Sequence, residues 1–261
     1  MSVNSPIDTL RLATDAGIAK ATSRTFSRLV VAAFLAGAYI ALGGVLSIII
    51  GFGFPEITAA NPGLQRLLSG LVFPIGLMLV VVLGADLFTG NNALLVPPMM
   101  NRRLSPFVVV KNWAIVWCAN FAGCLAVAYF LVYLTGLTAI EPYASSVAKI
   151  AVGKTSASFG VIFLKGIGAN WCVCLAVWLA LSGRRLGEKL LACEIPVMAF
   201  VALGYEHCIA NMFFIPLAMM QGADITVGQL FVSNLIPATL GNIVGGALFV
   251  GAVHVYLNGR R

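Results

Sequence analysis

The sequence predicts an all-α polytopic membrane protein, and its composition and hydropathy pattern carry that prediction. Hydrophobic residues make up 60% and charged residues 10% of the 261 positions, with a mean hydropathy of +0.99. A water-soluble domain of this length cannot bury so much apolar surface. The apolar residues gather in six windows, each long enough to cross a bilayer as a helix. These windows are residues 29–52, 67–100, 112–135, 158–181, 190–220 and 230–257.

Basic residues predict the orientation of the spans, because Lys and Arg stay preferentially in the cytoplasm. The net charge is +7, and most Lys and Arg residues fall before the first span, in alternate loops and at the chain end. They are Arg11, Lys20, Arg24, Arg28, Arg102, Arg103, Lys111, Arg184, Arg185, Lys189, Arg260 and Arg261. We therefore expect a multi-pass protein of the cytoplasmic (inner) membrane with both termini in the cytoplasm. Residues 1–28 are expected to form an amphipathic cytoplasmic helix, or else a solvated leader.

Polar residues and glycines interrupt the second window, in the stretch Gly84-Ala85-Asp86-Leu87-Phe88-Thr89-Gly90-Asn91-Asn92. Unwound backbone survives at bilayer depth only where it is buried in protein or lines a watery cavity. We therefore expect two half-helices joined by a loop, with a continuous helix whose polar side chains face its neighbours as the alternative. The third and sixth spans look regular, and residues 136–158 are expected to form a long external loop.

The fifth window places a carboxylate beside an imidazole inside an apolar run, in the stretch Gly204-Tyr205-Glu206-His207-Cys208-Ile209-Ala210-Asn211. An ionisable residue at bilayer depth costs roughly 2.5–3.5 kcal/mol on insertion scales. Glu206 and His207 are therefore expected to mark a functional site. A hydrogen-bonded packing role for His207 is the alternative.

Residues of the first half recur in the same order in the second half. Phe34, Leu35, Gly37, Asn92, Pro97, Met100, Asn112, Asn120 and Gly123 recur as Phe163, Leu164, Gly166, Asn211, Pro216, Met219, Asn234, Asn242 and Gly245. Each half holds three spans, so the second copy enters the membrane upside down. We expect two inverted three-helix repeats, residues 29–135 and 158–257, within one channel domain, residues 1–261. Such repeats place a substrate site near the midplane at broken second and fifth helices. The spacing matches Phe88 and Thr89 with His207 and Cys208.

These residues predict a pathway for a small monovalent anion. Asn92, Asn170, Asn211 and Asn242 donate hydrogen bonds without carrying charge, and half-helix N-termini favour anions. Lys154 attracts an anion from outside, and His207 can lend a proton to a weak acid. The candidates for apolar constrictions are Phe73, Leu77, Leu87, Phe88, Val173 and Phe200. A channel for a neutral solute such as water or ammonia is the alternative. An enzyme is disfavoured, since no second acid-base pair, metal-ligand cluster or nucleotide-binding loop is seen, and no cofactor or metal is expected.

Several motifs together resemble the formate/nitrite transporter family over essentially the whole chain. They are Leu87-Phe88-Thr89-Gly90-Asn91-Asn92, Lys111-Asn112-Trp113, Asn170, Gly204-Tyr205-Glu206-His207-Cys208-Ile209-Ala210-Asn211-Met212 and Gly241-Asn242. The resemblance implies an aquaporin-like protomer of six spans, assembled as a homopentamer in which each protomer has its own pore. It also implies that the substrate is formate, nitrite or hydrosulfide.

By position, the resemblance also assigns roles to single residues. His207 matches the family's central histidine, Thr89 its loop threonine and Lys154 its external lysine. Glu206 and Asn211 match the flanking carboxylate and asparagine, Asn170 and Asn242 the paired pore asparagines, and Phe73, Leu77, Phe88 and Phe200 the constriction positions. Lys165 and Glu194 also lie inside spans and fall outside these roles; each is expected to reach its own membrane interface.

Overall fold

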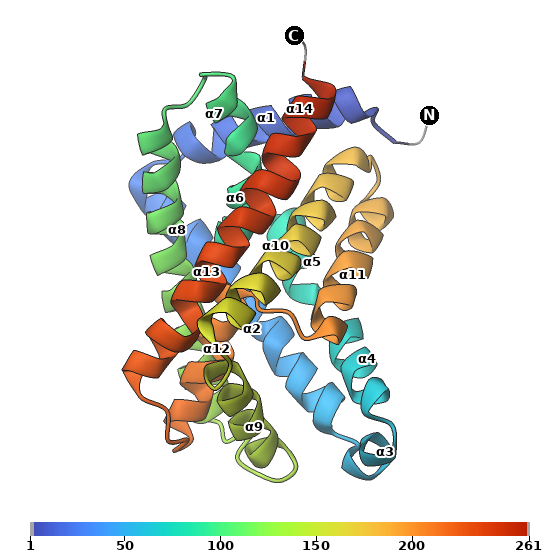
Figure 1. Cartoon of the computed structure of the whole chain (residues 1–261), viewed down its shortest axis with the longest axis vertical. Helices are drawn as coiled ribbons and strands as arrows, with labels where there is room; N and C mark the ends of the chain where they lie inside the picture. Colours follow the sequence, from blue (N-terminus) through green and yellow to red (C-terminus); the bar gives the residue numbers. More distant parts are fainter. Residues whose placement is uncertain (1–2, 260–261) are drawn as a thin grey trace.

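A computed structural model of the protein describes residues 3–259, which form helices joined by short connections (Figure 1). The prediction of an all-helical chain with several apolar helices is confirmed. Arg260 and Arg261, which were counted above among the basic residues, lie outside the described range. Among the described residues, five helical stretches are long and apolar enough to cross a membrane: Phe26–Phe52, Pro62–Leu83, Pro106–Tyr133, Phe159–Ser182 and Gln229–Asn258.

The first half of the chain contains the elements α1 to α8 and η1, a π-helical segment. Their bounds are α1 Pro6–Thr22, α2 Phe26–Phe52, α3 Pro55–Ala60, α4 Pro62–Val72, α5 Ile75–Leu83, α6 Phe88–Leu94, α7 Val96–Met100, α8 Pro106–Ala126 and η1 Val127–Tyr133. Serine and proline mark the helix starts, as expected for N-caps. Ser5 precedes Pro6, and its hydroxyl accepts a hydrogen bond from the backbone N–H of Asp8. Ser105 precedes Pro106, and its hydroxyl accepts from the backbone N–H of Val108.

The second half contains α9 to α14 and two further π-helical segments. Their bounds are α9 Tyr143–Thr155, α10 Phe159–Ser182, α11 Leu186–Leu203, α12 Cys208–Met220, η2 Gln229–Leu235, α13 Ile236–Ile243, η3 Val244–Ala252 and α14 Val253–Asn258. Two expectations differ from this result. Most of the expected external loop, residues 136–158, is helix α9, and the expected regular third and sixth spans contain π-helical turns.

The second and fifth windows each contain a short stretch without helix. Helix α5 ends at Leu83 and α6 begins at Phe88, while α11 ends at Leu203 and α12 begins at Cys208. The helix before each of these stretches ends on a glycine in the left-handed region, Gly84 with φ 71° and Gly204 with φ 70°. A residue with a Cβ is strained in that conformation, so glycine is the natural helix C-cap here.

Helices α1 and α14 lie at one end of the molecule, and α3 and α9 lie at the other (Figure 1). Between these ends, α2 packs on α8 and α10 packs on α13 and η3. Glycines allow this close approach: a Cβ on Gly123 would collide with the backbone of Phe34, and one on Gly245 with the backbone of Ile167. The close packing of small residues is typical of helix contacts in membranes. It brings the two non-helical stretches together between the two ends of the molecule (Figure 1).

Candidate substrate pathway

Glu206 lies in the second non-helical stretch and is held by a cation and two amides. Its side chain is 5% exposed. Its Oε2 accepts from Lys154 Nζ at 3.1 Å, from Asn211 Nδ2 at 2.7 Å and from Asn234 Nδ2 at 3.3 Å. The same Asn234 Nδ2 donates to the backbone carbonyl of Lys154 at 2.8 Å. A buried charge needs such partners, because an unpaired carboxylate at this depth costs several kcal/mol.

His207 caps helix α12, and this contact determines which ring nitrogen carries the proton. The backbone N–H of Ala210 donates to Nδ1 at 3.1 Å, so Nδ1 is the unprotonated nitrogen. In the neutral ring Nε2 then carries the hydrogen and donates it to Thr89 Oγ1 at 3.0 Å. Thr89 is the second residue of α6 and His207 is the N-cap of α12, so this bond joins the starts of the two helices that follow the non-helical stretches. Both side chains are buried.

A cavity of about 230 Å³ leads to His207 from the end that carries α3 and α9. Lys154 and Asn211 line its wall. At its floor the rings of Phe73 and Phe200 meet edge to face at 5.9 Å, and the Phe200 ring lies 5.8 Å from the His207 ring. The cavity has room for a small anion with several waters, since one water occupies about 30 Å³ in the liquid.

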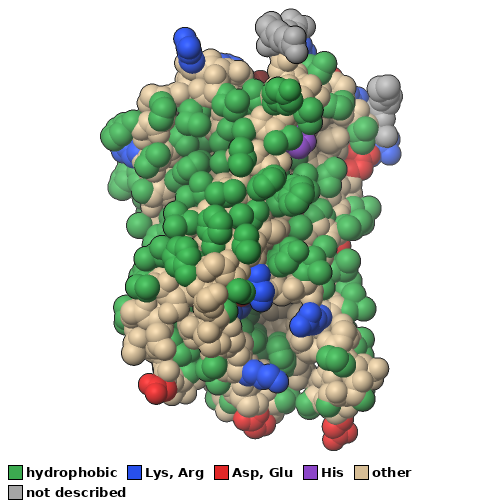
Figure 2. Space-filling view, in the orientation of Figure 1, with side chains coloured by type: hydrophobic (Ala, Val, Ile, Leu, Met, Phe, Trp, Pro, Cys, Tyr) green, Lys and Arg blue, Asp and Glu red, His purple; other side chains and the backbone are tan. Residues whose placement is uncertain are grey.

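Basic side chains surround the outer part of this passage. The cavity shares Arg66 with a wider hollow of about 470 Å³ that Lys149 also lines. Figure 2 shows Lys and Arg side chains gathered around a hollow in the lower half of the molecule, with acidic side chains at the lower tips. A cleft lined by one sign of charge concentrates ions of the opposite sign.

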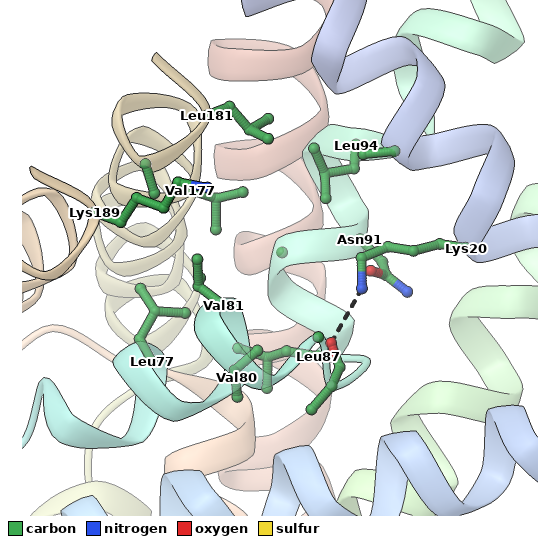
Figure 3. A pocket seen from close by; sticks show the side chains of 15 residues that line it. Lys20, Leu77, Val80, Val81, Leu87, Asn91, Leu94, Val177, Leu181 and Lys189 are labelled. Carbon is green, nitrogen blue, oxygen red and sulfur yellow. Dashed lines mark hydrogen bonds between the residues drawn. The ribbon is translucent and has the colours of Figure 1, made fainter. Parts of the chain in front are cut away.

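A second cavity of about 200 Å³ approaches from the α1 end, and Lys20 projects into it (Figure 3). The Lys20 ammonium donates to Asp86 Oδ1 at 2.8 Å and to the carbonyl of Ala85 at 3.1 Å. Asn91 Nδ2 lies 3.4 Å from the same Asp86 oxygen and 3.0 Å from Asn112 Oδ1. Asp86 itself is fully buried. This ion pair was missed above, because Lys20 was considered only for its effect on orientation.

Eight residues in the lining of each cavity correspond at one constant separation along the chain. The pairs are Val80 and Phe200, Val81 and Val201, Gly84 and Gly204, Ala85 and Tyr205, Leu87 and His207, Gly90 and Ala210, Asn91 and Asn211, and Leu94 and Phe214. The two linings share no residue. The buried side chains of Leu77 and Leu87 line the cavity near α1, and those of Phe73 and Phe200 line the cavity near α9; we call these four residues the apolar layer.

The hydrogen bonds correct the register that the sequence pattern suggested. The side chain of Asn120 accepts from the backbone of Phe88, and that of Asn242 accepts from Cys208, both at 2.9 Å. Phe88 thus corresponds to Cys208 and Leu87 to His207, one position away from the expected match of Phe88 with His207. The expected match rested on the Pro and Met residues that follow each stretch. The register given by the hydrogen bonds instead makes Gly84, at the end of α5, correspond to Gly204, at the end of α11.

The remaining predicted residues lie behind the cavity walls or within the apolar layer. Asn170 Nδ2 donates to the carbonyls of Thr89 at 3.2 Å and Asn242 at 2.7 Å, so these asparagines hold backbone and line neither cavity. Phe88 packs its ring on Trp113 at 6.4 Å. Val173 is buried on α10 and lines neither cavity.

Lys165 and Glu194, whose roles were left open, also lie outside the two cavities. Both side chains are half-buried. Lys165 contributes its backbone carbonyl, which accepts the N–H of Glu206 at 3.3 Å. Within residues 3–259 no group of three or more His, Cys, Asp or Glu side chains is placed to hold a metal ion.

Known proteins resemble this chain over nearly its whole length. The family model described as Formate/nitrite transporter matches residues 8–256. A probable formate transporter of Methanothermobacter thermautotrophicus is 41% identical over 271 residues, covering 98% of this chain and 97% of that protein. A formate channel of Bacillus thuringiensis is 38% identical over 251 residues, covering 96% of this chain and 94% of that protein.

Solved structures give the same likeness in three dimensions. A structure described as an FNT family ion channel matches with a TM-score of 0.85 at 32% identity, covering 96% of this chain and 98% of that one. A pentameric formate channel with formate bound matches with a TM-score of 0.80 at 33% identity, covering 90% of this chain and 99% of that one. The family likeness and the fold likeness therefore agree.

Proposed function

Because the chain belongs to the formate/nitrite transporter family, we propose that it carries small monovalent anions, formate foremost, across the cytoplasmic membrane. The family consists of transporters and channels, so the protein is not an enzyme. One observation carries the proposal: His207, bonded to Thr89, lies at the floor of a cavity whose wall carries Lys154. Formate is favoured because a related channel and a related transporter bear that name.

Lys20 and Lys154 each draw an anion into the cavity that they line. The apolar layer between the cavities then opposes passage of the charged anion. Moving an ion into a low-dielectric layer costs far more than moving a neutral molecule of the same size. A weak-acid anion that takes up a proton at the layer crosses it as the neutral acid and loses the proton on the other side. Hydrated ions are excluded by the same apolar side chains.

His207 and Thr89 are the groups that couple permeation to protonation. Nε2–H of the ring donates to the Thr89 hydroxyl, which keeps its own hydrogen available for a solute oxygen. The neutral ring gives up Nε2–H only after Nδ1 has taken a proton, since it would otherwise become an imidazolate. Water in the Lys154 cavity supplies that proton, and Nδ1 releases the N–H of Ala210 to accept it. The imidazolium then passes its Nε2 proton through the Thr89 hydroxyl to the anion and returns to the neutral ring.

The proposal extends to topology and assembly. Residues 29–135 and 158–257 form two inverted repeats of three spans, each with its middle helix broken at Gly84 or Gly204. The α1 end, with its many basic residues, faces the cytoplasm, so both termini lie inside. Five copies form the working unit, each with its own pathway, in line with the pentameric relative of known structure. The exposed apolar side chains of each copy then face lipid or a neighbouring copy.

Substitution of His207 by Phe tests the proposal, because Phe keeps the ring and removes both nitrogens. Purified protein in proteoliposomes is assayed for formate uptake, and an internal dye follows the protons that enter with it, across external pH 5–8. We expect wild-type uptake to rise as the external pH falls. H207F is expected to lose about 100- to 10,000-fold in rate, as for loss of a proton-transfer group, and to lose most of the pH dependence.

His254 offers a matched control, because it is the second histidine and lines neither cavity. Its Nδ1 lies 2.9 Å from the carbonyl of Val250, and its ring packs on Trp178. H254F should transport as the wild type does. An H207F protein with the wild-type pH profile would contradict the role given to His207. Wild-type vesicles that pass ammonia or water but no formate would favour a neutral-solute channel instead.

The identity of the anion is tested separately by comparing formate, nitrite and hydrosulfide. All three are small, singly charged conjugate bases, so Lys20 and Lys154 attract each of them. The apolar layer discriminates by the size and polarity of the neutral acid. We expect formate to show the highest uptake rate at equal concentration, and a faster rate for nitrite or hydrosulfide would reassign the substrate within the family.

A further inference from the structure

Arg24 gives Asp86 a second cation, and within residues 3–259 Glu206 has no counterpart to it. Arg24 Nη1 forms an ion pair with Asp86 Oδ2, the oxygen that Lys20 leaves free. Its Nη2 donates to the carbonyl of Gly84 at 2.6 Å, so the guanidinium spans the non-helical stretch. At the other site, Oε2 of Glu206 takes all three of its hydrogen bonds, and Oε1 takes none from residues 3–259.

The two ion clusters therefore differ by one unit of charge. Lys20, Arg24 and Asp86 sum to +1, whereas Lys154 and Glu206 sum to zero. One further cation lines each cavity, Lys189 near α1 and Arg66 at the other end, so the linings themselves differ in charge only through the two clusters; Lys149 lines the wider hollow that also contains Arg66.

The uncompensated charge is available to a solute, because Lys20 rather than the carboxylate faces the cavity. Asp86 does not line the cavity and its side chain is fully buried, while the side chain of Lys20 is 21% exposed. Figure 3 shows Lys20 reaching in from α1 beside Asn91. Arg24 satisfies the second carboxylate oxygen from behind. The positive charge of Lys20 is thus less offset by its own partner than that of Lys154.

We propose that Arg24 sets the affinity of the α1-end cavity for anions and makes it the tighter of the two anion sites. This inference rests on the proposed anion transport and names the residue that makes its two faces unequal. Arg24 does not line that cavity, so it acts as a positioning residue through Asp86 and Lys20. One unit charge within about 10 Å of an anion changes its affinity by roughly tenfold at an intermediate dielectric. The KM for formate is therefore about tenfold lower at the α1 face.

The chain offers a matched position for the opposite experiment. Arg24 stands two residues before Phe26, the first residue of α2, and Ala157 stands two residues before Phe159, the first residue of α10. Arg24→Ala makes the Asp86 site like the Glu206 site. Ala157→Arg adds the second cation where it is absent. Arg28 serves as the control, since it lines the same surface groove as Arg24 and makes no ion pair within residues 3–259.

The test measures formate uptake in right-side-out and inside-out membrane vesicles, which present opposite faces. R24A is expected to raise the α1-face KM about tenfold, with Vmax and the KM of the other face within twofold of wild type. R24K, which keeps the charge, should stay within threefold. A157R should lower the KM of the other face. R28Q should leave both faces unchanged. Thermal stabilisation of the purified proteins by formate reports anion binding without transport.

Each outcome bears on the inference. An α1-face KM that stays within twofold of wild type in R24A overturns it, as does an equal rise in R28Q. If R24A fails to fold, R24K and A157R decide, and an unchanged other-face KM in a folded A157R counts against the inference. A wild-type protein that moves no formate contradicts the proposed function instead, and the thermal-shift comparison of R24A with wild type then tests Arg24 alone.

Discussion

Around Asp86 and around Glu206 the chain builds the same hydrogen-bonded frame and fills it with different side chains. The Asn120 side chain accepts the first N–H of α6 and donates to the backbone carbonyl of Asp86. The Asn242 side chain accepts the first N–H of α12 and donates to the backbone carbonyl of Glu206, and all four distances are 2.9 Å. Asn91 and Asn211 each donate to the carboxylate itself. The frame repeats because unwound backbone inside a membrane must find its hydrogen bonds within the protein.

The departures from this common frame are where the two sites acquire separate tasks. Leu87 occupies the position of His207, so of the two cavities only the one near α9 carries an imidazole. Val80 occupies the position that corresponds to Phe200, so only the cavity near α9 has an aromatic contact with the imidazole ring. The comparison teaches that the paired asparagines bond the same backbone in both halves, while the residues without a match are the ones to which we assign chemistry and affinity.

Removing the lysine partner should reduce uptake more at the Glu206 site than at the Asp86 site. Lys154→Met leaves Glu206 without its cation, and loss of one partner of a buried ion pair costs about 3–5 kcal/mol. Formate uptake should fall at least about 100-fold. Lys20→Met should cost about tenfold only, because Asp86 keeps Arg24. Uptake and thermal stability of both purified variants provide the measurement, and equal losses in the two would contradict the unequal pairing.

A neutral partner provides the control for this prediction. Glu206→Gln removes the charge that Lys154→Met leaves uncompensated, so K154M/E206Q should regain most of the lost thermal stability. It should not regain uptake, because the attractive charge is still missing. Recovery of uptake in the double variant would show that Lys154 serves stability alone.

Loss of the frame asparagines should affect both sites equally. Asn120→Leu and Asn242→Leu each remove three hydrogen bonds and leave buried N–H and C=O groups unpaired. We expect each to lower the free energy of unfolding by about 2–3 kcal/mol. The thermal midpoints in detergent should therefore drop by similar amounts. A drop confined to one variant would mean that the two sets of hydrogen bonds do not contribute equally to the stability of the fold.

The sequence predicted the composition of these sites better than their pairing. The polar stretches around Asp86 and Glu206 stood out because polar groups are costly in apolar runs. The partner of Asp86 did not, since Lys20 lies 66 residues away along the chain and many basic residues precede the first span. The register of the two halves was one position off, because proline and methionine spacing varies with the helix that follows. Helix α9 was predicted as a loop because its apolar positions gain their partner, α12, only in the folded chain.

The hydrogen bond between Thr89 and His207 belongs to neither site alone, since it joins the first half of the chain to the second. Thr89→Val keeps the shape and leaves the buried Nε2–H of His207 without an acceptor, at a cost of about 1–2 kcal/mol. Uptake of formate should fall about tenfold. Thr89→Ser restores the hydroxyl and should recover most of the rate. Equal rates for T89V and wild type would remove Thr89 from the proton path.

The smallest expected effect concerns the residue that flanks Lys154. The Lys154 ammonium lies 5.8 Å from the centre of the Phe214 ring, whereas the matching position near Lys20 is Leu94. A cation over an aromatic face gains roughly 0.5–1 kcal/mol at a partly exposed site. Phe214→Leu makes this part of the two cavities alike and loosens the hold on the ammonium. We expect the KM for formate at the α9 end to change by about two- to fourfold, with no change at the α1 end. Uptake measured from the two faces decides, and an equal change at both faces would mean that Phe214 acts through the common apolar layer rather than through Lys154.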